Sequence, residues 1–240
     1  MLSVLMTRPA HQAEALSQAI LSAGGTVFYL PLFEIKPVFF QPVFIDNFDY
    51  CIFLSANAVT YFFAHQHQET SSKPLIAIGP ATQQMLYKNG FTQVICPADF
   101  NSDGLLAMSE LQAVTQKKIV IISGENSKPL LRETLHQRGA MVTTVYCYRR
   151  EPIQYDLPIL FGELQEGRVN AVISTSMESY HQLLLLFQKP LHRQWLLQCT
   201  LCVIHSAMKA EAQQAGFIRI LQAHNATDSA IFKVLQDMIF

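Results

Sequence analysis

The sequence predicts an α/β protein made of two similar domains, each with a parallel sheet covered by helices on both faces. Short apolar segments alternate with amphipathic helical segments, which is typical of parallel sheets in three-layer α/β/α domains. The same series of segments occurs twice. The two series begin with different segments but follow the same order. A length of 240 residues suits one large domain or two of ordinary size, and the repetition favours two.

One strand–helix–strand unit carries the repeat most clearly. In residues 119–152, an apolar strand, a polar turn at 123–127, an amphipathic helix stopped by Gly139 and a second strand follow one another. The start of the chain has the same layout at an offset of 115 residues. The matching positions are Val4 with Ile119, Leu16 with Leu131, Ile20 with Leu135, Gly24 with Gly139, Val27 with Val142 and Pro37 with Pro152.

The first half of the chain divides into elements by its turn residues. Apolar runs predict strands at 2–6, 26–30, 50–54, 75–78 and 93–96. Pro9 suits the first turn of a helix that Gly24 ends, Ser55 opens a second helix, and Pro80 lies in the start of a third that ends at Gly90. Asn101 supplies the N-cap of a fourth helix.

The second half repeats these elements. Strands are expected at 119–122, 142–148, 170–173 and 201–204, and a counterpart of the fifth strand brings the total to ten, five in each sheet. The helix after Ser176 matches the one after Ser55 at an offset of 121 residues. The helix from His205-Ser206 to Gly216 matches the one ending at Gly90 at an offset of 126, and Thr227 caps the last helix.

Two partitions into domains fit this pattern. A simple division would fall near residue 115. The extended segments PLFEIKP and VYCYRREP favour another, in which linker strands at about 31–38 and 146–152 pair with each other. One domain would then be 1–36 plus 153–240, and 38–148 would form an inserted domain.

Composition excludes several classes of protein. A net charge of −1 and a pI of 6.7, without a basic block, argue against nucleic-acid binding. No run of eighteen apolar residues exists, so we expect no membrane span, and the absence of a signal-peptide pattern predicts a cytoplasmic location. Five scattered cysteines predict neither a disulfide framework nor a metal site.

The candidate binding site consists of the turns that follow the strands. Ligands of such sheets bind outside the carboxyl ends of the strands, where helix starts offer free N–H groups and a partial positive charge. We therefore expect an anionic ligand between the domains, although such residues more often act only as helix caps. The candidates are Arg8, Ser55, Ala56, Asn57, Gly79, Pro80, Ala81, Thr82, Ser123, Gly124, Glu125, Asn126, Thr175, Ser176, Met177, His205 and Ser206.

Several motifs along the chain resemble uroporphyrinogen-III synthases. They are VLMTRP, PLFEIKP, FLSANAV, AIGPAT and ISGENSKPLLRETLHQRGAMVTTVYCYRR, followed by HNATDSAIFKVLQ near the end. The resemblance implies flavodoxin-like domains joined by a two-stranded linker, and a monomer that needs no cofactor or metal. It also implies that hydroxymethylbilane is cyclised to uroporphyrinogen III with loss of water and inversion of ring D. Transient contact with hydroxymethylbilane synthase would follow.

The resemblance also suggests an acid for the departing hydroxide. The family places a tyrosine in the helix after its TSP turn, where Ser-Met replaces Ser-Pro in this chain, and Gln182 stands at the position of that tyrosine. Tyr180, two residues earlier, is the nearest substitute, and we assign it the acid role as a hypothesis. Ser123 likewise stands where many members have arginine. The alternatives are a glycosyltransferase-like enzyme, for which no phosphate-binding glycine loop is found, and a non-enzymatic anion sensor.

Overall fold

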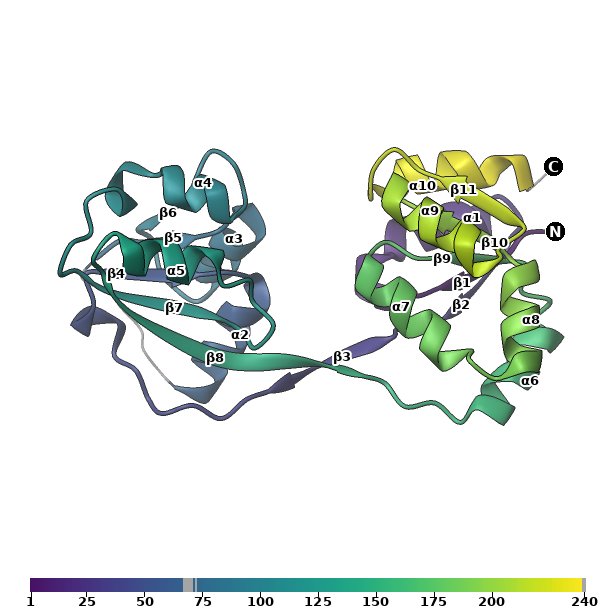
Figure 1. Ribbon diagram of the computed structural model, residues 1–240, viewed down its shortest axis with the longest axis horizontal. Helices are drawn as coiled ribbons and strands as arrows, with labels where there is room; N and C mark the ends of the chain where they lie inside the picture. The colour runs from purple at the N-terminus through teal and green to yellow at the C-terminus, as the bar shows by residue number, and fades with distance from the viewer. Residues whose placement is uncertain (67–70, 72, 239–240) are drawn as a thin grey trace. The chain divides into compact units, whose positions relative to one another are not determined.

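The computed structural model describes residues 1–66, 71 and 73–238, and the chain divides into two compact units. The first unit joins the two ends of the chain, Met1–Glu34 and Pro152–Phe240. The second is the continuous segment Ile35–Glu151. Each unit is an α/β structure whose parallel strands are covered by helices (Figure 1).

The first unit has a five-stranded sheet in the spatial order β11-β10-β9-β1-β2, with every described pair parallel. The strands are β1 (Ser3–Met6), β2 (Thr26–Tyr29), β9 (Ala171–Ile173), β10 (Thr200–Val203) and β11 (Arg219–Gln222). All residues of β1, β9 and β10 are buried, whereas the edge strands β2 and β11 are partly exposed. Burial on both faces explains why the central strands are continuous apolar runs in the sequence.

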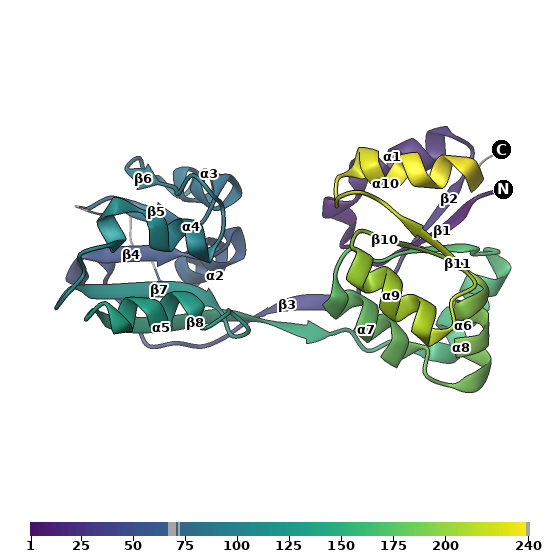
Figure 2. The same ribbon diagram turned by 45° about the horizontal axis from the view of Figure 1, so that its top comes forward.

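Helices cover both faces of this sheet. They are α1 (Glu14–Ser22), α6 (Leu157–Glu166), α7 (Met177–Leu186), α8 (Pro190–Gln198), α9 (Ser206–Ala215) and α10 (Asp228–Leu235), with 3-10 turns at Ala10–Gln12 and Gln236–Met238. Helices α1 and α10 pack together on one side of the sheet, and α7 and α9 lie on the other (Figure 2). Helices α6 and α8 are not among the elements expected from the sequence.

The second unit has six strands instead of the expected five, in the order β3-β8-β7-β4-β5-β6. They are β3 (Phe33–Pro37), β4 (Tyr50–Phe53), β5 (Leu75–Ala77), β6 (Val94–Ile95), β7 (Lys118–Gly124) and β8 (Met141–Pro152). The sixth strand arises because β8 continues for 12 residues and pairs with β3 beyond the end of β7. The pairs among β4 to β8 are parallel.

Two separate hydrophobic cores form on the two faces of the second sheet. Successive strand residues alternate between them, as a pleated strand requires: Phe53 lies in one core and Ile52 in the other. Helices α2 (Ala56–His65) and α3 (Pro80–Lys88) cover the Phe53 face, and α4 (Ser102–Ala107) and α5 (Leu130–Gln137) cover the Ile52 face. Short 3-10 turns lie at Ile45–Asn47 and Ser109–Leu111.

Both points where the chain passes from one unit to the other lie in the β3–β8 pair. Beside it, the Val38 N–H donates to the Cys147 carbonyl over 3.0 Å, and the Ile153 N–H donates to the Leu32 carbonyl over 3.0 Å. Lys36 and Arg149 form ion pairs with Glu151 within the pair. The extended segments identified in the sequence are therefore hydrogen-bonded to each other.

Two further properties follow from the described elements. None of the helices in the described ranges combines the length and apolar character required to span a bilayer. Among the same residues, no three His, Cys, Asp or Glu side chains gather closely enough to hold a metal ion. All five cysteines are free thiols.

Candidate functional site

The turn after β4 presents backbone donors at a helix start. Ser55 is the N-cap of α2, and its hydroxyl accepts a hydrogen bond from the Ala58 N–H over 3.0 Å. The N–H groups of Ala56 and Asn57 have no hydrogen-bond partner among the described residues. The first N–H groups of a helix cannot be satisfied within the helix. This turn therefore has two backbone donors that are not used within the described part of the chain.

The turn after β5 has a similar arrangement with a proline in it. Gly79 is the N-cap of α3 and Pro80 occupies the first turn, where its missing N–H would have had no helical partner. Ala81 and Thr82 contribute N–H groups that have no partner in the described part of the chain. Gly79 is packed closely against Phe100, since an added Cβ would lie 3.1 Å from the Phe100 Cβ.

Two turns of the first unit provide equivalent donors. Ser176 caps α7 and accepts from the Ser179 N–H over 3.1 Å, which leaves the Met177 N–H without a partner in the residues described. His205 is the N-cap of α9 but makes no side-chain cap. Ser206, which follows it, is exposed and has an unpartnered N–H within the described ranges. Thr175 lies half-buried beside the α7 start.

The turn after β7 is different and corrects one prediction. Ser123 and Gly124 belong to the strand instead of the turn, and the Ser123 side chain is buried. The Glu125 N–H donates to the Tyr148 carbonyl over 3.0 Å. Helix α5 begins only at Leu130. The expected donors of Ser123, Gly124 and Glu125 are therefore used in strand pairing or buried, and exposed Asn126 is the remaining candidate of that group.

Tyr148 was not a predicted site residue, but it connects two of these turns. Its hydroxyl lies 3.0 Å from the Ser55 Oγ, and its ring covers Gly124 so closely that an added Cβ would lie 2.7 Å from the ring. Glycine is therefore required at position 124 by close packing. Tyr148 lies in the VYCYRREP segment that the sequence analysis identified, but Ser55, to which its hydroxyl is bonded, lies 93 residues away in the sequence. The sequence alone therefore did not indicate this contact.

Arg8 is paired within the protein. Its Nη2 lies 2.6 Å from the Asp228 Oδ1, and the side chain of Arg8 is 15% exposed. The second Asp228 oxygen accepts the Leu16 N–H over 3.2 Å. Within the described chain the Arg8 Nε is buried without a partner. The charge expected to meet a ligand is thus largely neutralised by Asp228, a residue that the sequence did not indicate.

The structure places Tyr180, to which the sequence analysis assigned the acid role as a hypothesis, away from the protein surface. Its side chain is fully buried in the core of the first unit, and its hydroxyl has no hydrogen-bond partner among the described residues. Burial raises the pKa of this phenol, Glu211 raises it further, and Arg193 lowers it. A buried phenol that is not in contact with a ligand cannot deliver a proton to it, so this geometry argues against Tyr180 as the acid.

Comparison with known proteins agrees with the motifs. The family model described as uroporphyrinogen-III synthase HemD matches residues 14–233. The uroporphyrinogen-III synthase of Escherichia coli (strain K12) is 31% identical over 98% of this chain and 100% of its own length. The corresponding protein of Proteus mirabilis is 30% identical over 76% of this chain and 98% of its own.

Solved structures of low sequence identity have the same fold. The uroporphyrinogen-III synthetase of Helicobacter pylori 26695 aligns with a TM-score of 0.64 at 15% identity, over 99% of this chain and 100% of that one. A mutant uroporphyrinogen III synthase of the extremely thermophilic bacterium Thermus thermophilus aligns with a TM-score of 0.56 at 15% identity, over 99% and 100% of the two chains.

Proposed function

Because the chain belongs to the uroporphyrinogen-III synthase family, we propose that its helix-start turns bind the carboxylates of the linear tetrapyrrole hydroxymethylbilane. The activity is that of a uroporphyrinogen-III synthase, a cyclising enzyme of tetrapyrrole and haem biosynthesis. Each pyrrole of hydroxymethylbilane carries an acetate and a propionate. The ligand is thus the kind of polyanion that exposed N–H groups at helix starts attract.

The observation that carries this proposal is the set of unpartnered N–H groups at four helix starts in the described chain, those of α2, α3, α7 and α9. An anion at a helix start is stabilised by about 0.3–1 kcal/mol when exposed and by up to about 2 kcal/mol when partly buried. Several such contacts together could hold a flexible polycarboxylate in one shape, without requiring a strongly basic surface.

The chemistry requires mainly positioning. Departure of the ring A hydroxyl as water, after it receives a proton, leaves an azafulvene cation. Ring D then attacks through its substituted carbon to form a spiro intermediate, which fragments and recloses with ring D inverted. Without control the chain closes at the other carbon, so holding the acid side chains of the substrate selects which carbon of ring D meets the cation.

We also propose a fold type, an oligomeric state and a cellular location for this enzyme. The strand order of the first unit supports a flavodoxin-like arrangement as it stands, and that of the second unit does so once β3 is set aside and the count starts at β7. We propose a monomer acting in the cytoplasm without cofactor or metal. Transient contact with hydroxymethylbilane synthase would limit spontaneous closure of the substrate before it is bound.

The test uses freshly generated hydroxymethylbilane as substrate. After oxidation of the products, the isomeric uroporphyrins are separated and the type III fraction is compared with a sample lacking enzyme. We expect predominantly type III product. Type I alone would refute the proposed substrate and reaction.

A further inference from the structure

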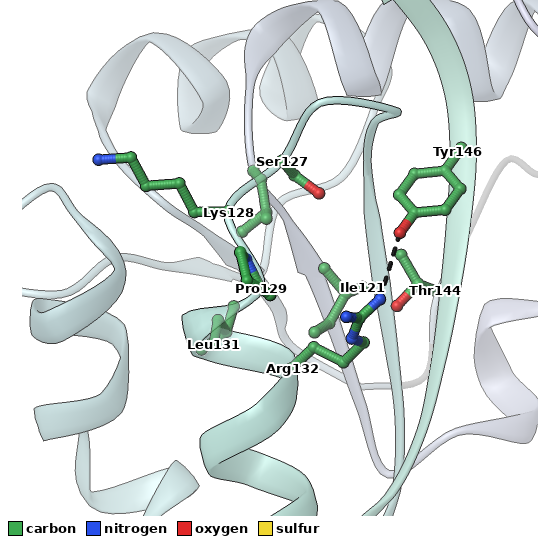
Figure 3. Close-up of a pocket in the computed structure, with 9 residues that line it drawn as sticks. Ile121, Ser127, Lys128, Pro129, Leu131, Arg132, Thr144 and Tyr146 are labelled. Carbon is green, nitrogen blue, oxygen red and sulfur yellow. Dashed lines mark hydrogen bonds between the residues drawn. The ribbon is translucent and has the colours of Figure 1, made fainter.

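A pocket in the second unit lies where the backbone donors of the β7 turn are already used. Its polar wall is formed by Ser127, Arg132, Thr144 and Tyr146, from the β7–α5 connection, α5 and β8 (Figure 3). The remaining lining residues are Leu54, Ile121, Lys128, Pro129 and Leu131. Since Tyr146 pairs with Ser123 at the end of β7, the pocket opens at the same carboxyl edge as the other turns.

Arg132 supplies the positive charge of this pocket. Its Nη1 donates to the Tyr146 hydroxyl over 3.4 Å, a long hydrogen bond, and the side chain is 46% exposed. Its contact with Glu133 is 3.9 Å long and lies at the surface, where such pairs contribute little. The guanidinium therefore has donors left for another group. Figure 3 shows the Lys128 ammonium pointing away from Arg132 and Tyr146.

The wall of the pocket also contains a hydroxyl that lacks a partner. The Thr144 Oγ1 is buried and makes no hydrogen bond to any described residue. Buried hydroxyl groups are normally satisfied by protein, water or ligand, so an unsatisfied one indicates a missing partner. Thr144 and Tyr146 are two residues apart on β8, so their side chains lie on the same face of the strand, beside Arg132.

We propose that this pocket binds one carboxylate side chain of the linear tetrapyrrole, with Arg132 as the charged donor and Thr144 and Tyr146 as hydroxyl partners. The proposal rests on the proposed function given above. The enclosed space is about 10 Å³, the size of one water, so the carboxylate would lie at the mouth of the pocket. There its two oxygens can accept from a guanidinium and a hydroxyl at once. Side-chain donors thus replace the backbone donors that the turn after β7 uses in pairing with β8.

The experiment compares Arg132→Gln with the matched control Lys88→Gln, which removes the same charge from an exposed side chain in the last turn of α3, outside the pocket lining. For Arg132→Gln we expect the KM for hydroxymethylbilane to rise by roughly tenfold, because a charge-assisted hydrogen bond is lost. Lys88→Gln should change KM by less than about twofold, because an exposed charge away from the pocket contributes little. Arg132→Lys, which keeps the charge but loses the planar fork, should give an intermediate value.

A second variant tests the hydroxyl independently. Thr144→Val should raise KM by roughly threefold and should not lower the melting temperature, since it removes a buried hydroxyl that has no partner among the described residues. Equal KM values for wild type, Arg132→Gln and Thr144→Val would overturn the proposal. Equal increases for Arg132→Gln and Lys88→Gln would overturn it as well, because they would indicate a general charge effect. A wild-type enzyme yielding only type I product would instead refute the proposed function.

Discussion

Removing a single backbone donor would test directly whether helix starts bind the substrate. Ser206 is the first residue of α9 and is exposed. Ser206→Pro deletes its N–H, which has no partner among the described residues. Proline is well tolerated at the first helical position, and His205 before it is already extended with φ −136° and ψ 145°. The substitution should therefore remove a ligand donor while leaving the helix intact.

The expected size follows from the energy of an anion at a helix start. A bound substrate would cover the exposed Ser206 N–H, so the loss lies in the upper, partly buried range of about 1–2 kcal/mol. This corresponds to an increase in KM of roughly five- to thirtyfold. The melting temperature should change by less than about 2 °C, because no hydrogen bond between described residues is lost. Ser206→Ala is the matched control, since it removes the hydroxyl but retains the N–H, and its KM should rise by less than about threefold.

The assay is steady-state formation of type III product from freshly generated hydroxymethylbilane, with thermal unfolding measured on the same samples. If the proline and alanine variants have the same KM and the same isomer ratio, the N–H of Ser206 does not bind substrate. If only the melting temperature of the proline variant falls, the helix has been damaged, and the variant then reports on folding instead of on binding.

Three further predictions concern residues inside the two units. Tyr180→Phe should retain turnover within about twofold and keep or raise the melting temperature, because the buried hydroxyl has no described partner; a hundredfold loss of turnover in a stable variant would restore the acid role. Gly124→Ala should lower stability by about 1–3 kcal/mol in thermal unfolding, because its Cβ would lie 2.7 Å from the Tyr148 ring; an unchanged melting temperature would contradict this packing. The buried thiols of Cys147, Cys199 and Cys202 should resist iodoacetamide at pH 8 in the folded protein, because burial raises each thiol pKa to about 12. At that pH roughly one part in ten thousand of each thiol is the reactive thiolate. Mass spectrometry of the labelled peptides checks this, and rapid labelling of the folded protein would show that the thiols are accessible.

Helix starts were predictable because their chemistry is local. Ser55, Asn101 and Thr227 are N-caps in the structure, and each accepts from the backbone N–H three residues further on. Helix α6 also has a local signal in the sequence, because Asp156 caps it and a proline lies in its first turn. It was not predicted because it lies outside the repeated pattern of segments. Recognising caps independently of the repeat would have identified this helix.

Other features depend on contacts between distant segments and could not be predicted from one sequence. The Arg8–Asp228 pair joins residues 220 positions apart, and nothing local to Arg8 indicates its partner. The extension of β7 through Gly124 depends on pairing with β8, whose register shifts between Ser123 and Gly124. Tyr180 fits a helix start by spacing, but the packing of its neighbours determines that it is buried.

The interrupted construction of the first unit has a consequence for synthesis on the ribosome. Strand β1 lies between β2 and β9, so the first strand to be made lacks one neighbour until residues 171–173 have emerged. The second unit is continuous from Ile35 to Glu151 and can be complete earlier. During synthesis the second unit should therefore fold first, and one edge of β1 should stay unpaired until residues 171–173 have emerged from the ribosome.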